Sequence, residues 1–489
     1  MKEFTEKEHP SAAAINLFLK LTQIPRPSGH EALVAGKIAE FAKKHGFETT
    51  VDKASNVHIL VPAVPGCEKV PSVCLQGHTD IVAVAREGLD FDFVNTPLPV
   101  RIENGFIFSD GTSLGADDGI GVAAALAAAT DPSLMHGPLE LLFTTGEETT
   151  MGGASALEPG CLKSEYLLNL DNETEGLAVI GCAGGINADL KIKLRRAGLG
   201  QSDGLTAAKL KISNLKGGHS GEDIDKKRIN AIRCIAELIR SASEKFEVRL
   251  ADLNGGKFKN AIPSSAEAVL LVKNSDFSSV SGFIMESGRR IKEHASDEDR
   301  NVMFELTGCE SDGSYIENSD ELLGSILAWP DGVLRMSGKY QGLPEDSSNL
   351  GVLRTHESYA EGSILIRSNT HLDEAAAEMR ELFSRNGGTA ELTLSGAYYP
   401  WVPIASSPLT AAVQNSFRKV TGREMRAAVI HAGVECALLT RIVPGLDAVS
   451  FGPDALDIHS EHERISLETI DRFWLTLKDV LENFAGENK

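Results

Sequence analysis

The segment Leu139-Glu140-Leu141-Leu142-Phe143-Thr144-Thr145-Gly146-Glu147-Glu148 sets the expectation for the fold. Its first seven residues form a short, mostly apolar run, and a glycine with two acidic residues follows at once. Three further runs share this pattern, at 73–75, 166–170 and 448–451. Short apolar runs bounded by turn residues are typical of buried strands in a mostly parallel sheet. The sequence therefore predicts an α/β fold.

Residue types that bind metals recur beside these apolar runs. They occur in Gly77-His78-Thr79-Asp80, Gly115-Ala116-Asp117-Asp118-Gly119, Gly146-Glu147-Glu148, Leu170-Asp171 and Ile458-His459-Ser460. Any one of these segments alone is more typical of an ordinary hydrogen-bonded loop. Open α/β sheets, however, place their active sites at the C-terminal ends of strands. Together the segments supply two imidazoles and several carboxylates, the ligand set that a pair of zinc ions needs for hydrolysis.

The composition argues against several classes of function. At 489 residues the chain exceeds one ordinary core, so two or more domains are expected. A formal net charge of −21 argues against nucleic acid or a membrane as partner, because both reward Lys and Arg. The first residues lack the apolar region of a signal peptide, and the seven cysteines are scattered without CxxC pairs. These features predict a cytoplasmic protein with reduced thiols.

The pattern of predicted helices and strands along the chain changes twice, which predicts an inserted domain. Helices and strands alternate from Ala12 to about Gly184, including a buried helix over 119–129 that is too short to span a bilayer. After an intervening section, residues 400–489 return to the first domain and end in a helix over 467–484 with Ser466 as its N-cap. The expected parts are a catalytic domain made of 1–185 and 400–489 and an inserted α+β domain over 186–399.

The inserted domain is expected to contain alternating strands and amphipathic helices. Strands are predicted at 210–212, 247–250, 268–272, 303–306, 333–336, 363–366 and 390–394, and helices at 228–240, 279–294 and 372–384. The insert is long enough for two α+β sandwich units of roughly a hundred residues each. No sequence repeat relates its halves, so this duplication depends on the order of the elements.

With these residues in place, the chain resembles the co-catalytic zinc exopeptidases, a family that includes carnosine-cleaving dipeptidases, tripeptidase T, carboxypeptidase G and succinyl-diaminopimelate desuccinylase. The likeness covers nearly the whole chain. It implies that family's mixed sheet flanked by helices, with an inserted lid of two ferredoxin-like sandwich units. Segments that are similar to the family's dipeptidases are Ile24-Pro25-Arg26-Pro27-Ser28, Ile180-Gly181-Cys182-Ala183-Gly184-Gly185, Lys216-Gly217-Gly218-His219-Ser220-Gly221 and His431-Ala432-Gly433-Val434-Glu435-Cys436.

The resemblance also implies a metal site with two zinc ions per chain, for which cobalt or manganese can substitute. Asp117 would bridge the two ions. His78 and Asp171 would complete the site of one ion, and Glu148 and His459 would complete the other. A carboxylate bridge of this kind holds two cations about 3.5–4 Å apart.

Further roles follow from the same resemblance. Glu147, next to a ligand, would be the general base. Asp80 would hydrogen-bond the far nitrogen of the His78 imidazole and fix its tautomer. A cis peptide bond is implied between residues 117 and 118. His462 lies three residues after His459, which leaves open which of these two imidazoles is the ligand.

Substrate recognition is expected from the inserted domain. Arginine is the natural bidentate partner of a C-terminal carboxylate, and Arg367 matches the family's substrate arginine. Asn260 and His219 resemble its lid residues, with His219 available to polarise the scissile carbonyl. Gly433 and Glu435 match a loop near the carboxylate end. An ordinary turn residue and an ordinary surface cation stay as alternatives for His219 and Arg367.

The implied activity is hydrolysis of small, unblocked dipeptides, including Xaa-His dipeptides such as β-alanyl-histidine. Glycine-rich joins near 184–185 and 396–397 would let the inserted lid close over them. A related di- or tripeptidase, or a deacylase of N-acyl amino acids, fits the same metal residues, although the double-length insert favours the dipeptidases. A non-catalytic carrier or scaffold would have lost a ligand or the base, and neither is lost. The oligomeric state stays open, with a homodimer among the options.

Overall fold

The computed structural model describes residues 3–198 and 204–486, which form two compact units. The first unit takes the described parts of 1–181, 401–429 and 434–489, and the second takes the described parts of 182–400 and 430–433. The expected insert, 186–399, lies inside the second unit. The segment 430–433 had been expected in the catalytic domain, yet it packs with the second unit as well.

An eight-stranded mixed sheet forms the centre of the first unit. Its four middle strands run parallel to one another, and each coincides with one of the four apolar runs of the sequence. Parallel strands are usually covered on both faces, so they are buried along their length. Three of these four strands are buried at every residue. In order the strands are β1 (Glu48–Val51), β2 (Val57–Val61), β6 (Leu139–Thr144), β3 (Val73–His78), β7 (Tyr166–Asn169), β23 (Asp447–Ser450), β8 (Leu177–Cys182) and β22 (Arg426–Ile430).

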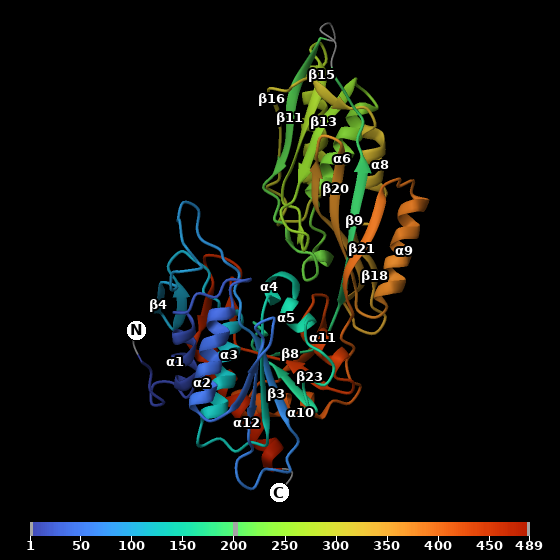
Figure 1. Ribbon diagram of the computed structural model, residues 1–489. Helices are drawn as coiled ribbons and strands as arrows, with labels where there is room; N and C mark the ends of the chain where they lie inside the picture. The colour runs from blue at the N-terminus through green and yellow to red at the C-terminus, as the bar shows by residue number, and fades with distance from the viewer. Residues whose placement is uncertain (1–2, 199–203, 487–489) are drawn as a thin grey trace. The chain divides into compact units, whose positions relative to one another are not determined.

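Helices pack against this sheet and against one another in the first unit (Figure 1). The Ala- and Gly-rich α3 (Ala116–Thr130) is buried along nearly its whole length, so α1 (Ala12–Leu21) and β3 can approach it closely. A small separate sheet has the order β24 (Ala455–Leu456), β25 (Arg464–Ser466), β5 (Phe106–Ser109) and β4 (Val100–Glu103). The helices are α1 (Ala12–Leu21), α2 (Ala32–Lys44), α3 (Ala116–Thr130), α4 (Glu147–Thr150), α5 (Gly152–Ser155), α10 (Pro408–Thr421), α11 (Cys436–Ile442) and α12 (Leu467–Gly486).

A nine-stranded sheet forms the second unit. A single residue pair, Gly255 with Leu353, joins β13 (Val248–Gly255) to β19 (Pro344–Thr355), so the sheet has two halves. Along the main path the order is β16 (Met303–Gly308), β11 (Leu205–Ser213), β15 (Ala266–Lys273), β13 (Val248–Gly255), β19 (Pro344–Thr355), β20 (Tyr359–Ser368), β9 (Gly184–Lys193) and β21 (Glu391–Tyr398), and β18 (Gly332–Met336) pairs with β19.

Four helices cover the two halves of this sheet. α6 (Ala231–Ser243) and α7 (Phe277–His294) pack on the half around β15, and α9 (Leu372–Arg385) packs on β20 and β9. α8 (Ser319–Ala328) contacts both α6 and α9. Short pairs complete the unit, namely β10 (Arg196–Gly198) with β17 (Ser314–Ile316) and β12 (Gly218–His219) with β14 (Ala261–Ile262). The predicted fold class is confirmed: a mixed α/β sheet flanked by helices, with an inserted α+β domain.

The predicted elements of the insert all correspond to observed ones, with small shifts at their ends. α6 begins at Ala231 and not at 228, because the Asn230 side chain accepts hydrogen bonds from the N–H groups of Ile232 and Arg233 and so caps the helix. The helix α8 and the long strands β9 and β19 have no predicted counterpart, and neither do the short strands β10, β12, β14 and β17. Among the described residues, no helix is both long and apolar enough to cross a membrane.

Candidate functional site

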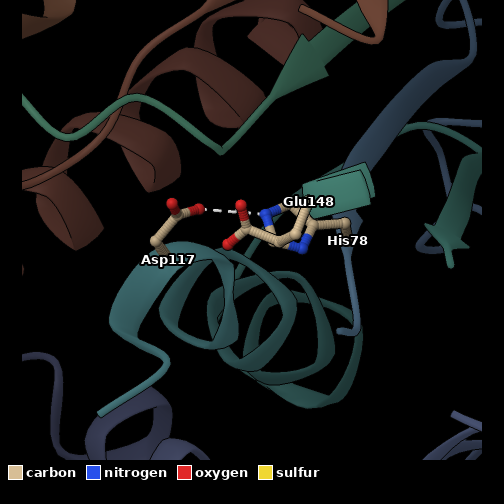
Figure 2. A group of neighbouring side chains, drawn as sticks. All are labelled: His78, Asp117 and Glu148. Atoms are coloured by element: carbon tan, nitrogen blue, oxygen red, sulfur yellow. Dashed lines mark hydrogen bonds and ion pairs between the residues drawn. The ribbon is translucent and has the colours of Figure 1, made fainter. Parts of the chain in front are cut away.

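Three candidate ligands follow parallel strands of the first unit. His78 is the last residue of β3, Asp171 lies two residues beyond β7, and Glu148 lies in α4, just after β6. Because adjacent parallel strands end at the same edge of a sheet, these side chains converge. Figure 2 shows His78, Glu148 and Asp117 with their polar ends close together, and one ligand atom of each lies within 4.8 Å of the others.

Asp117 stands at the centre of this cluster. It lies at the start of α3, before the backbone becomes regularly helical, and its peptide bond to Asp118 is cis, as the resemblance implied. Its Oδ1 lies 2.9 Å from His78 Nε2, and its Oδ2 lies 3.0 Å from His459 Nε2. Each oxygen of this one carboxylate therefore faces a different imidazole, which is the arrangement that a bridging ligand needs.

The other candidates divide between the two sides of Asp117. Asp171 Oδ1 lies 3.3 Å from His78 Nε2, and Glu148 Oε2 lies 2.9 Å from His459 Nε2. The buried Asp171 Oδ1 nevertheless has no hydrogen-bond partner among the described residues. The grouping is that of the two expected ligand sets, and metal binding by these residues stays a prediction.

The charge of this cluster fits bound cations. Burial raises the pKa of Asp171 to about 8, and the negative charge of Asp117 adds to the effect. Burial lowers the pKa of His459, but the carboxylates of Asp117 and Glu148 outweigh this effect and raise the pKa to about 11. The pKa shift of His459 reflects the two carboxylates beside it, whereas that of Asp171 is due mainly to burial. A buried acceptor without a hydrogen bond, together with nitrogen and oxygen donors of the types that zinc accepts, makes these residues fit divalent metal ions.

Asp80 lies beside the ligands and organises the turn after β6. Its Oδ1 accepts from the N–H of Glu147 at 3.1 Å, and its Oδ2 accepts from the N–H of Glu148 at 3.3 Å. The His78 Nδ1 lies 3.2 Å from the main-chain oxygen of Asp80 and 3.5 Å from its Oδ1. A separation of 3.5 Å is too long for a strong hydrogen bond, so the main-chain oxygen is the nearer partner of the imidazole.

His459, and not His462, faces the carboxylates. Both residues lie in the loop between β24 and β25, where Asp457 and His459 adopt positive φ angles. The side chain of His462 is 74% exposed, and the acidic group recorded beside it is that of Glu461, 3.9 Å away. The geometry therefore separates the two histidines that the sequence left as alternatives.

A second cluster surrounds Arg367, within the second unit. Arg367 lies in β20 and is only 3% exposed. Its Nη1 donates to the Tyr398 hydroxyl at 2.9 Å, and its Nη2 lies 3.3 Å from His219 Nε2. Among the described residues its Nε has no hydrogen-bond partner, and no carboxylate forms an ion pair with the guanidinium. Buried charges are normally paired, so this one is suited to a carboxylate from outside the chain.

A glycine lets Tyr398 reach Arg367 across the sheet. β9 lies between β20 and β21, and its residue Gly185 is the register partner of Arg367 on one side and of Tyr398 on the other. A Cβ atom at Gly185 would lie 2.7 Å from the hydroxyl oxygen and the ring of Tyr398. The absent side chain therefore gives the tyrosine ring its place beside the guanidinium.

His431 adds a buried neutral imidazole to the second unit. The Ser347 hydroxyl donates to its Nε2 at 2.7 Å, and its Nδ1 donates to the Asn369 side-chain oxygen. Burial lowers the pKa of His431 to about 3, and the positive charges of Arg367 and His219 add to this shift. The ring is therefore uncharged at neutral pH, with both nitrogens engaged.

The remaining substrate candidates have different surroundings. Asn260 is exposed and precedes β14, and its carbonyl accepts from the N–H of Ser220 at 2.8 Å. Gly433 is half-buried in the second unit. Glu435 is buried in the first unit, where it accepts from Thr144 Oγ1 at 2.6 Å and from Gln76 Nε2 at 2.7 Å. The structure thus brings His219 and Arg367 together and places Glu435 among the strands that carry the metal candidates.

Comparison with known proteins assigns this chain to a family. Residues 74–483 match peptidase family M20/M25/M40. The chain belongs to this family. It is 33% identical over 476 residues to the cytosol non-specific dipeptidase of Escherichia coli (strain K12), a match that covers 96% of this chain and 97% of that protein. Membership in peptidase family M20 confirms the family and the enzyme class that the motifs indicated, a hydrolase of peptide bonds, and it implies a metal cofactor.

Solved structures agree with this family. The aminoacylhistidine dipeptidase from Vibrio alginolyticus is similar to this M20 member with a TM-score of 0.79 and 32% identity, over 98% of each chain. The aminopeptidase PepT from Bacillus cereus matches with a TM-score of 0.57 and 16% identity, over 98% of this chain and 99% of that one. At that level of identity the second likeness shows the fold alone.

The sequence did not indicate several residues of these two clusters. Local sequence assigned no role to Tyr398, Ser347 or Asn369. His431 belongs to a segment that resembles the family's dipeptidases, and that segment was the one available signal. The proximity of all four depends on strand register and on a distant loop, which local sequence does not show.

Proposed function

We propose that this M20-family chain is a di-zinc dipeptidase that hydrolyses unblocked dipeptides, Xaa-His dipeptides such as β-alanyl-histidine among them. The proposal is carried by the position of Asp117, with one oxygen 2.9 Å from His78 Nε2 and the other 3.0 Å from His459 Nε2. A carboxylate placed in this way serves two ions better than one. The names of two full-length relatives, a non-specific dipeptidase and an aminoacylhistidine dipeptidase, support the substrate class.

The five candidate ligands divide into two sets in this proposal. His78 and Asp171 hold one ion, Glu148 and His459 hold the other, and Asp117 serves both. Bound divalent ions would supply the positive charge that polarises a peptide carbonyl and makes a water molecule more acidic. Zinc is the expected ion, and cobalt or manganese, which accept the same nitrogen and oxygen donors, are expected to substitute.

Glu147 is the proposed general base. Burial raises the pKa of Glu147 well above its usual value, and the negative charges of Asp171 and Glu148 add to the shift, while the charge of His78 opposes it. A carboxyl group with a raised pKa suits a residue that takes a proton from the attacking water and returns it to the leaving amine. Asp80 assists by accepting from the N–H of Glu147 and so fixing the turn that carries the base.

Arg367 is the proposed receptor for the C-terminal carboxylate of the dipeptide. Its burial and its Nε without a partner among the described residues favour a bidentate pair with an incoming carboxylate. Asn260 and Gly433 are proposed as further substrate contacts. His219 is proposed to donate to the scissile carbonyl from its Nε2, because its Nδ1 accepts from the N–H of Glu222 at 3.3 Å and the ring proton is then on Nε2.

Glu435 has a supporting part in this proposal. Its carboxylate accepts from Thr144 and Gln76, which lie in β6 and β3, the strands that lead to Glu148 and His78. The name of the Escherichia coli relative places that protein in the cytosol, and we propose the same compartment for this chain.

Metal reconstitution followed by a substrate panel tests the function. Metal-free protein is titrated with zinc, cobalt or manganese, and activity is measured on β-alanyl-histidine, other dipeptides, a tripeptide and an N-acetyl amino acid. We expect activity on dipeptides to return as two ions bind per chain. Saturation at one ion would refute the di-metal site, and a preference for the tripeptide or the N-acetyl substrate would refute the dipeptidase assignment.

Two histidine variants give this experiment a matched control. His459→Ala should lose metal and activity, because the ring faces Asp117 and Glu148. His462→Ala, three residues further along the same loop, should retain both, because its ring is exposed and lies outside the cluster. If the two variants behaved in the opposite way, the assignment of the second ion would be wrong.

A further inference from the structure

Glu463 is a buried carboxylate that holds the loop leading to Asp117. It is 2% exposed and accepts from three successive backbone N–H groups. Its Oε2 accepts from Leu114 at 2.7 Å and from Gly115 at 2.9 Å, and its Oε1 accepts from Ala116 at 2.7 Å. Asp117 is the next residue along the chain. A buried carboxylate requires such donors, and here all three of them come from the approach to one candidate metal ligand.

Arg26 is the matching buried cation. It is 2% exposed, and its Nη1 donates to the main-chain oxygens of Thr79 at 2.8 Å and Asp80 at 3.3 Å. Its Nη2 donates to the main-chain oxygen of Gly115 at 2.6 Å. One guanidinium therefore ties the turn that follows His78 to the turn that precedes Asp117.

Two glycines make room for this guanidinium. A Cβ atom at Gly119 would lie 2.4 Å from Arg26 Nη2, and one at Gly115 would lie 2.9 Å from it. Gly115 also has a φ of +67°, which favours glycine. Its N–H is bonded to Glu463 and its C=O to Arg26, so the residue is fixed from both sides.

Glu463 also links a third ligand segment to the other two. It follows His459 by four residues in the chain, in the segment that joins β24 to β25. The segments that carry His78, Asp117 and His459 are thus connected through two buried charges. The two charges form no ion pair with each other. Both nitrogens at the end of the Arg26 guanidinium and both oxygens of Glu463 bond to backbone groups of the ligand loops, while Arg26 Nε has no hydrogen-bond partner among the described residues.

We propose that Arg26 and Glu463 are positioning residues that set the spacing of His78, Asp117 and His459 before metal binds. This inference depends on the proposed metal centre and adds residues that do not touch the ions. A ligand set fixed in advance loses less conformational freedom on binding, and outer partners of metal ligands typically contribute about 10- to 100-fold in metal affinity. A role in folding alone would lower stability without this separate loss of affinity.

Variants of both residues test the proposal against a buried carboxylate elsewhere in the first unit. Glu463→Gln replaces an acceptor oxygen by a donor, and Arg26→Lys keeps the charge but cannot span both turns. Glu140→Gln is the control: Glu140 is 3% exposed and accepts from the Lys163 N–H at 2.8 Å, but it lies near the start of β6, away from the ligands.

Zinc affinity is measured by competition with a chelator, together with the visible spectrum of the cobalt-loaded protein and thermal unfolding of each metal-free variant. We expect about a 10- to 100-fold loss of zinc affinity and an altered cobalt spectrum for Glu463→Gln and Arg26→Lys, and neither for Glu140→Gln. Unchanged affinity and spectrum in a folded Glu463→Gln or Arg26→Lys protein would overturn the positioning role. So would an equal loss of affinity in Glu140→Gln at equal loss of stability.

The wild-type protein separates this inference from the proposed function. If wild-type protein bound no metal, the metal centre itself would be wrong and the positioning role would fail with it. If wild-type protein bound two ions and the variants bound them equally well, only the positioning role would fail. Should Glu463→Gln not fold, the milder Arg26→Lys substitution still decides, because it retains the buried positive charge.

Discussion

Replacing Arg367 by alanine removes the proposed receptor for the substrate carboxylate and leaves the metal cluster untouched. The guanidinium is 3% exposed, has an Nε without a partner among the described residues, and has no carboxylate of the described chain in an ion pair. A dipeptide carboxylate bound there would form two charge-assisted hydrogen bonds. Each such bond contributes about 1.5–3 kcal/mol.

The size of the effect follows from these bonds. Nη1 already donates to Tyr398 and Nη2 already contacts His219, so we take the lower end of the range, about 3 kcal/mol for the pair. Since each 1.4 kcal/mol is tenfold, KM for a free dipeptide should rise about 100-fold. The carboxylate does not change during the reaction, so kcat should change little. Zinc content should equal that of the wild type.

The assay compares a free dipeptide with the same dipeptide amidated at its C-terminus. For the amide, Arg367→Ala should differ little from wild type, because no carboxylate is present to be lost. Tyr398→Phe keeps the ring beside Gly185 but removes the acceptor of the Arg367 hydrogen bond, so it should raise KM for the free dipeptide by a smaller factor. Equal losses on free and amidated substrates in Arg367→Ala would refute carboxylate recognition by this residue.

Two further predictions concern the base and acid stability. Glu147→Ala should retain metal while activity falls by about a hundredfold or more, whereas Glu148→Ala should lose metal. Metal analysis and rate measurements check this. The reverse pattern would mean that Glu148 is the base and Glu147 the metal ligand. Burial lowers the pKa of His431 to about 3, below its ordinary value of about 6.5 in an unfolded chain, so protons bind the unfolded state preferentially. The stability from the neutral ring is therefore complete above about pH 6.5 and is lost at about 1.4 kcal/mol per unit as pH falls toward 3. Urea unfolding of His431→Gln between pH 7 and 4 should show a shallower loss, and a slope equal to that of wild type would contradict the buried neutral state.

The metal candidates could be predicted because each lies next to a local signal. His78, Glu148 and Asp171 follow short apolar runs, and the position of a residue after a buried strand fixes the edge of the sheet at which it emerges. Asp117 needed the resemblance as well, since its role depends on reaching two histidines, one of which is more than three hundred residues away in the chain.

The strand β19 shows why other parts could not be predicted. Its first residues, Pro344-Glu345-Asp346-Ser347-Ser348-Asn349, have the polar composition of a loop. In the structure residues 346–349 are buried, and two of their side chains form hydrogen bonds with residues outside β19. Trp329 Nε1 donates to the Ser348 hydroxyl at 2.6 Å, and Asn349 donates to the carbonyl of Ala261 at 2.9 Å. Composition predicts a loop here because these partners come from tertiary structure.

Glu463 was missed for a related reason. In the sequence it is one acidic residue in the polar run Ser460-Glu461-His462-Glu463, and nothing local separates it from Glu461. Its three amide donors lie almost 350 residues earlier in the chain. Tyr398 likewise depends on register, because Gly185 aligns it with Arg367 only after three strands have paired.

The segment 430–433 affects how this protein can be recombined with its relatives. The chain crosses from one compact unit to the other four times, at 181/182, 400/401, 429/430 and 433/434, and a single inserted cassette would cross only twice. A chimera that transplants residues 182–400 alone leaves His431 behind, so Ser347 and Asn369 lose their buried partner. Each buried polar group left without a hydrogen bond costs about 1–3 kcal/mol, enough to endanger a marginally stable fold. The exchangeable module is therefore discontinuous, and residues 430–433 have to be transplanted together with residues 182–400.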